Sequence, residues 1–298
     1  MKWNRKAVEG MAGAWAFRMA LRTFRRKSNE GAERSGARLG MLIFWLSKKH
    51  RERARSNLAF AMPELSPEER ERIARGVFLH FGRMLGDFLR TEVRTDAEVI
   101  ESVEITGLEH VDAALELGKG VISVGAHFGN FERASQWASA NGIPLHAVAR
   151  DANSSTLNDM VNELRTMAGA KVLSRGNAIR GILETLRKNQ IVAILPDQNA
   201  SEIFVPFFGH PCGCVLGPAV IHERTGAPVI PAYTVWLAPG KYRIIVGAPL
   251  TKVAGYEDSP EGMTRAINES LEAIIRQYPE QWLWLHDRWK SARRKGLL

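Results

Sequence analysis

The sequence has few cysteines and no long hydrophobic run, and each absence excludes a class of protein. Only 2 of the 298 residues are Cys, which is too few for a disulfide framework. No apolar run approaches the roughly 20 residues that a membrane-spanning helix needs. Arg18 ends the run at 10–17, and Lys48 and Lys49 follow the run at 39–46. With 45% hydrophobic residues, the chain can instead build a large soluble-type core.

Positive charge is concentrated near the N-terminus. The whole chain has a formal net charge of +9, whereas residues 1–55 alone carry 15 basic and 4 acidic side chains, a net charge of +11. A local excess of this kind predicts an anionic partner that binds to this segment. Glu9 interrupts the apolar start and a basic cluster follows it, so we expect the segment to be retained and not cleaved as a signal peptide.

The same segment has the pattern of an amphipathic helix. Apolar side chains recur at helical spacing between arginines: Val8, Met11, Trp15, Phe17, Met19, Leu21 and Phe24. Such a helix either lies on an anionic lipid surface or packs on the core of its own protein. Trp15 and Trp45, beside basic clusters, favour the membrane surface. We therefore expect a basic amphipathic arm at 1–55, at the membrane interface, followed by an α/β domain at 56–298.

Helix and strand patterns alternate along the rest of the chain. Ser66-Pro67-Glu68-Glu69 has an N-cap, a Pro at the first helical position and a capping-box Glu, which predicts a helix from 67 to about 93. The run GVISVG at 120–125 is typical of a strand covered on both faces. Further helices are expected at 107–117, 153–168, 177–189 and 260–278, and strands at 191–195, 229–237 and 242–246. The pattern predicts a single α/β domain with a central, mixed, largely buried sheet flanked by helices.

His127 and Glu132 follow the strand at 120–125 with the spacing H-x4-E. Ligands of open α/β sheets bind at the carboxyl ends of strands, so we place the chemistry here. On one continuous helix the two side chains would lie about 140° apart, so they meet only if Gly129 and Asn130 form a turn. His127 is then a general base whose tautomer Glu132 fixes. The alternative is a histidine that ends a strand and caps the next helix.

Four segments extend this motif: VGAHFGNFE at 124–132, DQN at 197–199, VPFFG at 205–209 and WLHDRWK at 284–290. Together they resemble the late acyltransferases of lipid A biosynthesis, the lauroyl and myristoyl transferases, and their relatives, the phosphatidylinositol-mannoside acyltransferases. The resemblance runs from about residue 40 to residue 290. It implies a glycerolipid-acyltransferase-like fold and a membrane-associated enzyme that needs no cofactor. Such an enzyme moves an acyl chain from acyl carrier protein or acyl-CoA to a hydroxyl of a glycolipid.

The resemblance also implies roles for single residues. His127 is the base and Glu132 its partner, while Arg150 stands where the family has an arginine near the oxyanion or an acceptor phosphate. A fixed guanidinium suits the negative charge that acyl transfer develops on the thioester oxygen. The remaining assignments are substrate-binding or oxyanion roles for Asp197, Gln198 and Asn130, and an acyl-chain groove lined by Phe128, Phe204, Phe207 and Phe208.

Each of these assignments has an ordinary structural alternative. Arg150 can form a surface ion pair with Asp151 or Glu163. Asp197 follows Pro196 and can form a turn. Clustered phenylalanines are most often part of a core.

The segment after VPFFG departs from the family pattern, which has a small residue and a Thr there. This chain has Pro211-Cys212-Gly213-Cys214, so the acceptor and the chain length stay open. His210, Cys212, Cys214 and His222 do not have a standard zinc spacing. We therefore expect reduced structural cysteines and no metal.

A second basic cluster, at 288–295, is interleaved with Trp282, Trp284 and Trp289. This composition is typical of a membrane-interface anchor, of a phosphate-binding rim and also of a nucleic-acid site. Nucleic-acid binding needs neither the H-x4-E motif nor the apolar N-terminal stripe, so we expect no nucleic-acid partner.

The predicted protein is a peripheral or monotopic acyltransferase on the cytoplasmic face of the inner membrane. Its expected partners are an acyl carrier protein or acyl-CoA donor, a lipid A precursor as acceptor, and an anionic membrane surface. Three alternatives remain open: a phosphatidylinositol-mannoside acceptor, a glycerol-phosphate acceptor, and a non-catalytic protein that binds lipid or nucleic acid.

Overall fold

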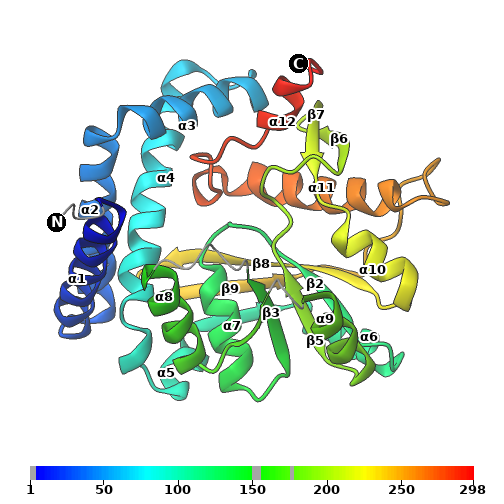
Figure 1. Ribbon diagram of the computed structural model, residues 1–298, viewed down its shortest axis with the longest axis horizontal. Coiled ribbons are helices and arrows are strands. Elements are labelled where there is room, and N and C mark those ends of the chain that lie inside the picture. The colour runs from blue at the N-terminus through cyan, green and yellow to red at the C-terminus, as the bar shows by residue number, and fades with distance from the viewer. Residues whose placement is uncertain (1–4, 150–155, 175–177) are drawn as a thin grey trace.

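The computed structural model describes residues 5–149, 156–174 and 178–298. The first four helices of the described chain are α1 (Arg5–Arg25), α2 (Asn29–Leu46), α3 (Lys48–Ala61) and α4 (Pro67–Phe88). Helices and strands then alternate (Figure 1). The first of these elements are α5 (Asp96–Glu101), β1 (Val103–Thr106), α6 (Leu108–Glu116), β2 (Val121–Val124), α7 (Phe131–Ala140), β3 (Leu145–Ala149), α8 (Thr156–Met167), β4 (Lys171–Ser174), α9 (Ala178–Arg187) and β5 (Ile191–Ile194).

The C-terminal third contains β6 (Ile203–Phe207), β7 (His210–Cys214), α10 (Gly217–Thr225), β8 (Val229–Ala238), β9 (Lys241–Val246), α11 (Pro260–Gln277) and α12 (Lys290–Arg294). Seven strands form one sheet in the order β1-β9-β8-β2-β5-β3-β4, and β6 and β7 form a separate antiparallel pair. Within the large sheet, β8 and β9 are antiparallel and the other neighbours are parallel. The predicted mixed central sheet is therefore confirmed.

Helices cover both faces of this sheet, with α11 above it and α7 below it in Figure 1. Alternate residues of β2 point to the two faces, because successive side chains of a strand do so. Val121 packs with Trp137 of α7, whereas Ile122 and Val124 pack with the α9, α10 and α11 side. All three β2 residues are fully buried. The strand expected at 120–125 is therefore confirmed as buried on both faces.

Helix α4 begins at the predicted capping box. The Ser66 hydroxyl accepts the Glu69 N–H at 3.1 Å, and the Glu69 carboxylate accepts the Ser66 N–H at 2.8 Å. The helix ends at Phe88, earlier than the expected residue 93, because a short 3-10 turn at Thr91–Val93 leads the chain to α5.

Helix α2 packs on α4 without an intervening layer of side chains. A Cβ atom added to Gly36 would lie 2.0 Å from the carbonyl oxygen of Gly82, and one added to Gly40 would lie 2.0 Å from that of Phe78. Only glycine permits backbones to approach this closely. The expected division at residue 55 is corrected, because α2 is part of this packing and α3 runs through residue 55 without a break.

The expected apolar stripe of α1 divides between the two interpretations. Leu21 and Phe24 are buried in a core cluster with Leu164 of α8, so this part of the helix packs on the protein. Trp15 and Met19 are exposed, Trp15 by 67%. The side chains of Val8 and Met11 lie outside the described residues. No helix in the described part of the chain is both long enough and apolar enough to span a membrane.

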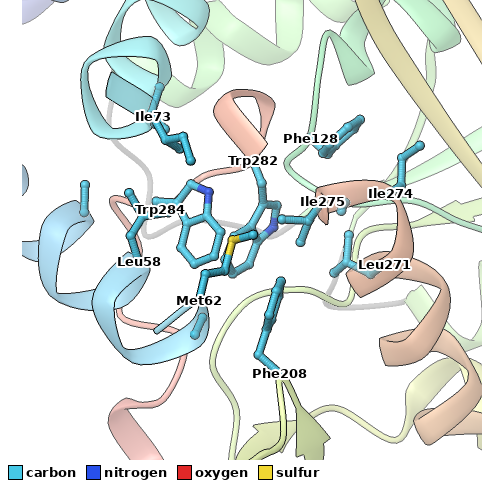
Figure 2. Close-up of a cluster of buried hydrophobic side chains, with 14 of the residues drawn as sticks. Leu58, Met62, Ile73, Phe128, Phe208, Leu271, Ile274, Ile275, Trp282 and Trp284 are labelled. Atoms are coloured by element: carbon cyan, nitrogen blue, oxygen red, sulfur yellow. The ribbon is translucent and has the colours of Figure 1, made fainter. Parts of the chain in front are cut away.

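The C-terminal tryptophans belong to the largest core cluster and not to a membrane anchor or a phosphate rim. Trp282, Trp284 and Trp289 are almost completely buried. Figure 2 shows Trp282 and Trp284 between side chains of α3 and α4 on one side and of α11 on the other. Burial of an aromatic ring removes a large apolar area from water, so the core position stabilises the folded protein more than an exposed position beside the basic residues would.

We predict that Gly36→Ala destabilises the protein by about 3 kcal/mol, because the added methyl group overlaps the backbone of α4. The matched control is Gly13→Ala in α1, where an added Cβ meets no atom within 4 Å. This control should leave stability unchanged or raise it by about 1 kcal/mol, since Ala favours helices. Urea unfolding followed by circular dichroism measures both. Equal unfolding free energies for the two variants would contradict the close backbone contact between α2 and α4.

Candidate active site

Two parallel strands deliver His127 and Asp197 to the same edge of the sheet. Strand β2 pairs with β5, and Val124 at the end of β2 lies opposite Ile194 at the end of β5. His127 and Asp197 each follow these residues by three positions. Parallel strands with aligned ends place the residues that follow them side by side, which is where open α/β sheets bind their ligands.

Asp197 holds His127 through its side chain and its backbone. Asp197 Oδ1 lies 2.8 Å from His127 Nδ1, and Asp197 Oδ2 accepts the His127 backbone N–H at 2.9 Å. The indole N–H of Trp282 donates to the same Oδ2 at 3.1 Å. A carboxylate at Nδ1 assigns the ring proton to that nitrogen, which leaves the lone pair on Nε2.

This contact shifts both pKa values toward the charged forms. Burial raises the pKa of Asp197, but the charge of His127 and the hydrogen bonds from His127 and Trp282 outweigh it, so the net shift is downward. Burial lowers the pKa of His127, but the charge and hydrogen bond of Asp197, with a further contribution from Glu132, raise it above the ordinary value of 6.5. The neutral imidazole is therefore a stronger base than a free histidine.

Gln198 approaches the other nitrogen of the ring. Its side-chain Nε2 lies 3.3 Å from His127 Nε2, so the amide is placed to donate to the ring lone pair. His127 and Gln198 both line a cavity. A substrate hydroxyl that enters this cavity replaces Gln198 as the hydrogen-bond partner of Nε2, which is the position that a general base requires.

The turn after His127 needs a glycine. Gly129 has φ +56°, and a Cβ there would lie 1.5 Å from the carbonyl oxygen of Thr234. The Gly129 N–H donates to the Gln281 carbonyl at 2.7 Å, and the Asn130 N–H donates to the Thr234 carbonyl at 3.2 Å. These contacts fix the chain direction between His127 and α7.

The Asn130 side chain points away from the cavity. It is buried, and its amide donates to Asp87 of α4 at 2.7 Å. Asp87 also accepts two hydrogen bonds from Arg133, at 2.6 and 2.8 Å, and pairs with Arg94. The expected substrate-binding or oxyanion role of this side chain is corrected, because its amide N–H is used by Asp87 and the side chain does not line the cavity. Asn130 instead anchors the turn to α4.

Glu132 is paired with an arginine and not with His127. Arg165 of α8 donates to both carboxylate oxygens, with its Nη2 2.5 Å from Oε1 and its Nε 3.1 Å from Oε2. The expectation that Glu132 fixes the tautomer of His127 is corrected, because Asp197 holds that position. Glu132 acts on the imidazole through space, and its charge helps to raise the pKa of His127. Nothing in the local sequence around Arg165 marks it as a site residue.

The cavity beside His127 is about 430 Å³ and mostly apolar. It lies on the α7 face of the sheet. Its polar wall includes the His127 and Gln198 pair and the Glu132 and Arg165 pair. Much of the remaining wall is hydrophobic and comes from five elements, β1, α6, α7, β3 and β4: Ile105, Leu108, Val111, Trp137, Leu145 and Val172. A site of this kind suits a long apolar ligand with one reactive polar end.

The expected acyl groove is only partly where the sequence placed it. Phe128 lines the cavity. Phe207 and Phe208 instead pack in the core with the C-terminal tryptophans, and Phe204 lies on the separate β6-β7 pair under Lys295. The assignment of these three to the groove is corrected, because they are not part of the cavity wall. Arg150 lies outside the described residues.

Across the ranges that the structure describes, no three His, Cys, Asp or Glu residues are grouped as a metal site would require. The four residues considered for zinc have other contacts. His210 stacks on Phe60, His222 Nδ1 lies 2.8 Å from the Ala227 carbonyl, and Cys212 and Cys214 are free and buried.

Comparison with known proteins identifies the family of the chain. A model of the bacterial lipid A biosynthesis acyltransferase family matches residues 4–291. The chain is 26% identical over 252 residues to a lipid A biosynthesis acyltransferase of Haemophilus influenzae, covering 83% of this chain and 78% of that one. It is 27% identical to the lipid A biosynthesis palmitoleoyltransferase of Escherichia coli, over 86% of this chain and 84% of that one.

A phosphatidylinositol mannoside acyltransferase of Mycobacterium tuberculosis is 24% identical, over 96% of this chain and 91% of that one. Among solved structures, a 1-acyl-sn-glycerophosphate acyltransferase of Thermotoga maritima aligns with a TM-score of 0.38 and 16% identity. That alignment covers 67% of this chain and 83% of that one.

We predict that the pKa of His127, followed by NMR of labelled histidine rings, lies above 6.5 and falls by about one unit or more in Asp197→Asn. The fall follows because the amide no longer stabilises the imidazolium charge. Glu132→Gln is the matched control: it removes one carboxylate that does not contact the ring, so the pKa should fall less. A larger fall in Glu132→Gln than in Asp197→Asn would return the orienting role to Glu132.

Proposed function

Because this chain belongs to the bacterial lipid A biosynthesis acyltransferase family and is an acyltransferase for lipid-type acceptors, we propose that its acceptor is a hydroxyl of a lipid A precursor. The donor in this proposal is an acyl thioester of acyl carrier protein or CoA. The observation that carries it is the His127 imidazole, held by Asp197 at Nδ1, with Nε2 on the wall of an apolar cavity.

The proposed reaction is one direct attack. The acceptor hydroxyl donates to His127 Nε2, and its oxygen attacks the thioester carbonyl carbon as the proton passes to the imidazole. The tetrahedral intermediate then collapses, the C–S bond breaks, and the imidazolium returns the proton to the leaving thiolate. Asp197 keeps the ring in the correct tautomer and stabilises the imidazolium that forms between the two steps.

Arg165 is our candidate for the cation that stabilises the oxyanion. Its guanidinium is fixed by two carboxylate contacts with Glu132, and both side chains line the cavity that contains His127. A cation fixed before the reaction costs no reorganisation when the charge develops. In this proposal Glu132 acts by holding Arg165 and by raising the pKa of His127.

The apolar wall of the cavity is proposed to hold the acyl chain. Leu108, Val111 and Trp137 contribute to this wall, so a hydrocarbon tail there leaves water while its thioester end stays near His127. Lipid A biosynthesis acyltransferases of other organisms include a palmitoleoyltransferase, and phosphatidylinositol mannoside acyltransferases are relatives too. Acceptor identity therefore needs a direct test.

We predict that the wild-type chain adds one acyl group to lipid A in a Gram-negative host that lacks its own late acyltransferase, as measured by mass spectrometry. His127→Ala should lower turnover by about 10²–10⁴-fold, the usual effect of losing a general base. Glu132→Ala should lower it as well, because Arg165 loses its anchor. Circular dichroism and membrane fractionation of each variant control for folding.

Near-normal activity of His127→Ala would remove the proposed mechanism. An expressed, folded wild type that leaves lipid A unchanged would remove the lipid A acceptor. The same purified chain is then assayed with a phosphatidylinositol mannoside and with glycerol phosphate, which test the other two acceptors directly.

We also propose that the protein works on the anionic cytoplasmic face of the inner membrane, with α2 against the lipid. Leu39, Leu42, Ile43 and Leu46 lie on one face of α2 at helical spacing, and all four are exposed, Leu46 by 76%. Trp45 is exposed beside them, and exposed Arg38, Lys48 and Lys49 flank the stripe. Apolar side chains flanked by cations suit an anionic bilayer surface.

We predict that Leu42→Glu with Leu46→Glu weakens binding to phosphatidylglycerol vesicles by about tenfold or more, because two apolar contacts with lipid are lost and two negative charges appear. The matched control is Leu117→Glu with Ile179→Glu, which changes a side chain exposed by 62% at the end of α6 and one exposed by 65% on α9. Vesicle flotation measures both. Equal flotation of the two double variants would show that α2 is not the lipid-facing surface.

A further inference from the structure

Arg288 is a fully buried cation beside the active-site loop. Its Nη1 donates to the backbone carbonyls of Gln198 at 3.1 Å and Gly213 at 2.5 Å. Its Nη2 donates to Cys214 Sγ at 3.0 Å. The side chain thus joins the loop that contains Gln198, strand β7 and the C-terminal segment.

A buried guanidinium needs a counter-ion. Arginine stays protonated in proteins, and an unpaired charge in the interior is strongly unfavourable. Within the described ranges, Arg288 forms no salt bridge with a carboxylate. The neighbouring Asp287 pairs with Arg53 and Arg293, and Asp197 is held by His127 and Trp282. The carboxylates near Arg288 therefore have other partners.

Cys214 has the surroundings of a thiolate. Its Sγ accepts from Arg288 Nη2 at 3.0 Å and from the Asn268 amide of α11 at 3.4 Å, whereas two acceptors, the Cys212 carbonyl and Asn268 Oδ1, lie farther away at 3.5 and 3.7 Å. A hydrogen bond from the Cys212 thiol, against the effect of burial and together with the charge of Arg288, lowers the pKa of Cys214 to about 6. Burial raises the pKa of Cys212 well above its ordinary value, so Cys212 stays a neutral thiol, and its Sγ donates to the Arg288 carbonyl at 3.6 Å.

We propose that Cys214 is a thiolate in the folded protein, that it is the counter-ion of Arg288, and that the two form a positioning pair for the loop of Gln198. The charged and titratable groups that face Cys214 are Cys212 from its own strand and Arg288 from the C-terminal segment, while α11 contributes the neutral Asn268. Arg293, further along the C-terminal segment, acts on Cys212 through space. The pair acts on the reaction only through the loop, because neither side chain lines the cavity.

The first experiment measures the thiolate directly. The ultraviolet absorbance of thiolate is recorded for the native protein as the pH rises from about 5 to 9, a range in which an ordinary buried thiol stays protonated. We expect on the order of one thiolate per chain at neutral pH. Cys214→Ser should lose this absorbance, whereas Cys212→Ser, which keeps a hydroxyl donor at the matched position, should retain it. Native wild-type protein without thiolate absorbance at pH 8 overturns the proposal.

The second experiment tests the positioning role by restoring the charge. Cys214→Ser leaves Arg288 without its anion, and we expect kcat for acyl transfer to fall by about tenfold, with a smaller change in KM for the donor. Cys214→Asp provides an anion of nearly the same size, and we expect it to recover most of kcat and of the melting temperature. A Cys214→Asp protein no better than Cys214→Ser in both measurements overturns the counter-ion role.

The activity measurements rest on the proposed function, whereas the absorbance does not. Thiolate absorbance in a wild-type protein that transfers no acyl group would leave the counter-ion pair in place and reject the proposed function. Acyl transfer by a wild-type protein without thiolate absorbance would reject the counter-ion pair and leave the proposed function in place.

Discussion

The parallel pairing of β2 with β5 is the contact on which the site depends. It aligns the ends of two buried strands, and His127 and Asp197 follow those ends at the same distance. Because Asp197 is buried, its charge requires donors, and the His127 ring, the His127 backbone and the Trp282 indole supply them. The C-terminal segment thereby becomes part of the candidate active site, although it lies far from both strands in the sequence.

Buried charges organise the rest of the site in the same way. Asp87 ties α4 to the turn at Asn130 and to Arg133 of α7, and Glu33 ties α2 to the β8-β9 hairpin by accepting from Trp236, Gly240 and Tyr242. Each buried charge is stabilised by partners on another element, because an unpaired one would be costly. The catalytic turn is consequently held from several directions rather than by one helix.

The sequence was most informative where local pattern determines structure. The capping box at Ser66 and the run at 120–125 both predicted real elements, since caps and buried strands depend on neighbouring residues. The edge strands β1 and β4 escaped prediction because half of their residues are polar and no continuous apolar run marks them, and the inner strand β3 escaped as well. The β6-β7 pair escaped because its turn has positive φ at Phe208 and Gly209, where hairpin turns more often have Asn-Gly, and because both strands contain Pro. The partners of His127 and Glu132 come from the loop after β5 and from α8, and no local spacing can identify contacts made across so long a stretch of chain.

The contact of α2 with α4 through glycine has a mechanical consequence. Side chains between helices can change rotamer and let the helices slide, but two touching backbones have no such layer to deform. Helix α4 also anchors the catalytic turn through Asp87. The exposed stripe of α2 and the His127 imidazole are thus connected by a rigid strut, so the height of the base above any surface on which α2 rests is a fixed dimension of the fold. In the proposed arrangement, with α2 on the bilayer, an acceptor embedded in that surface would have to bring its reactive group to this height, so the depth at which an acceptor is anchored would act as a selection rule.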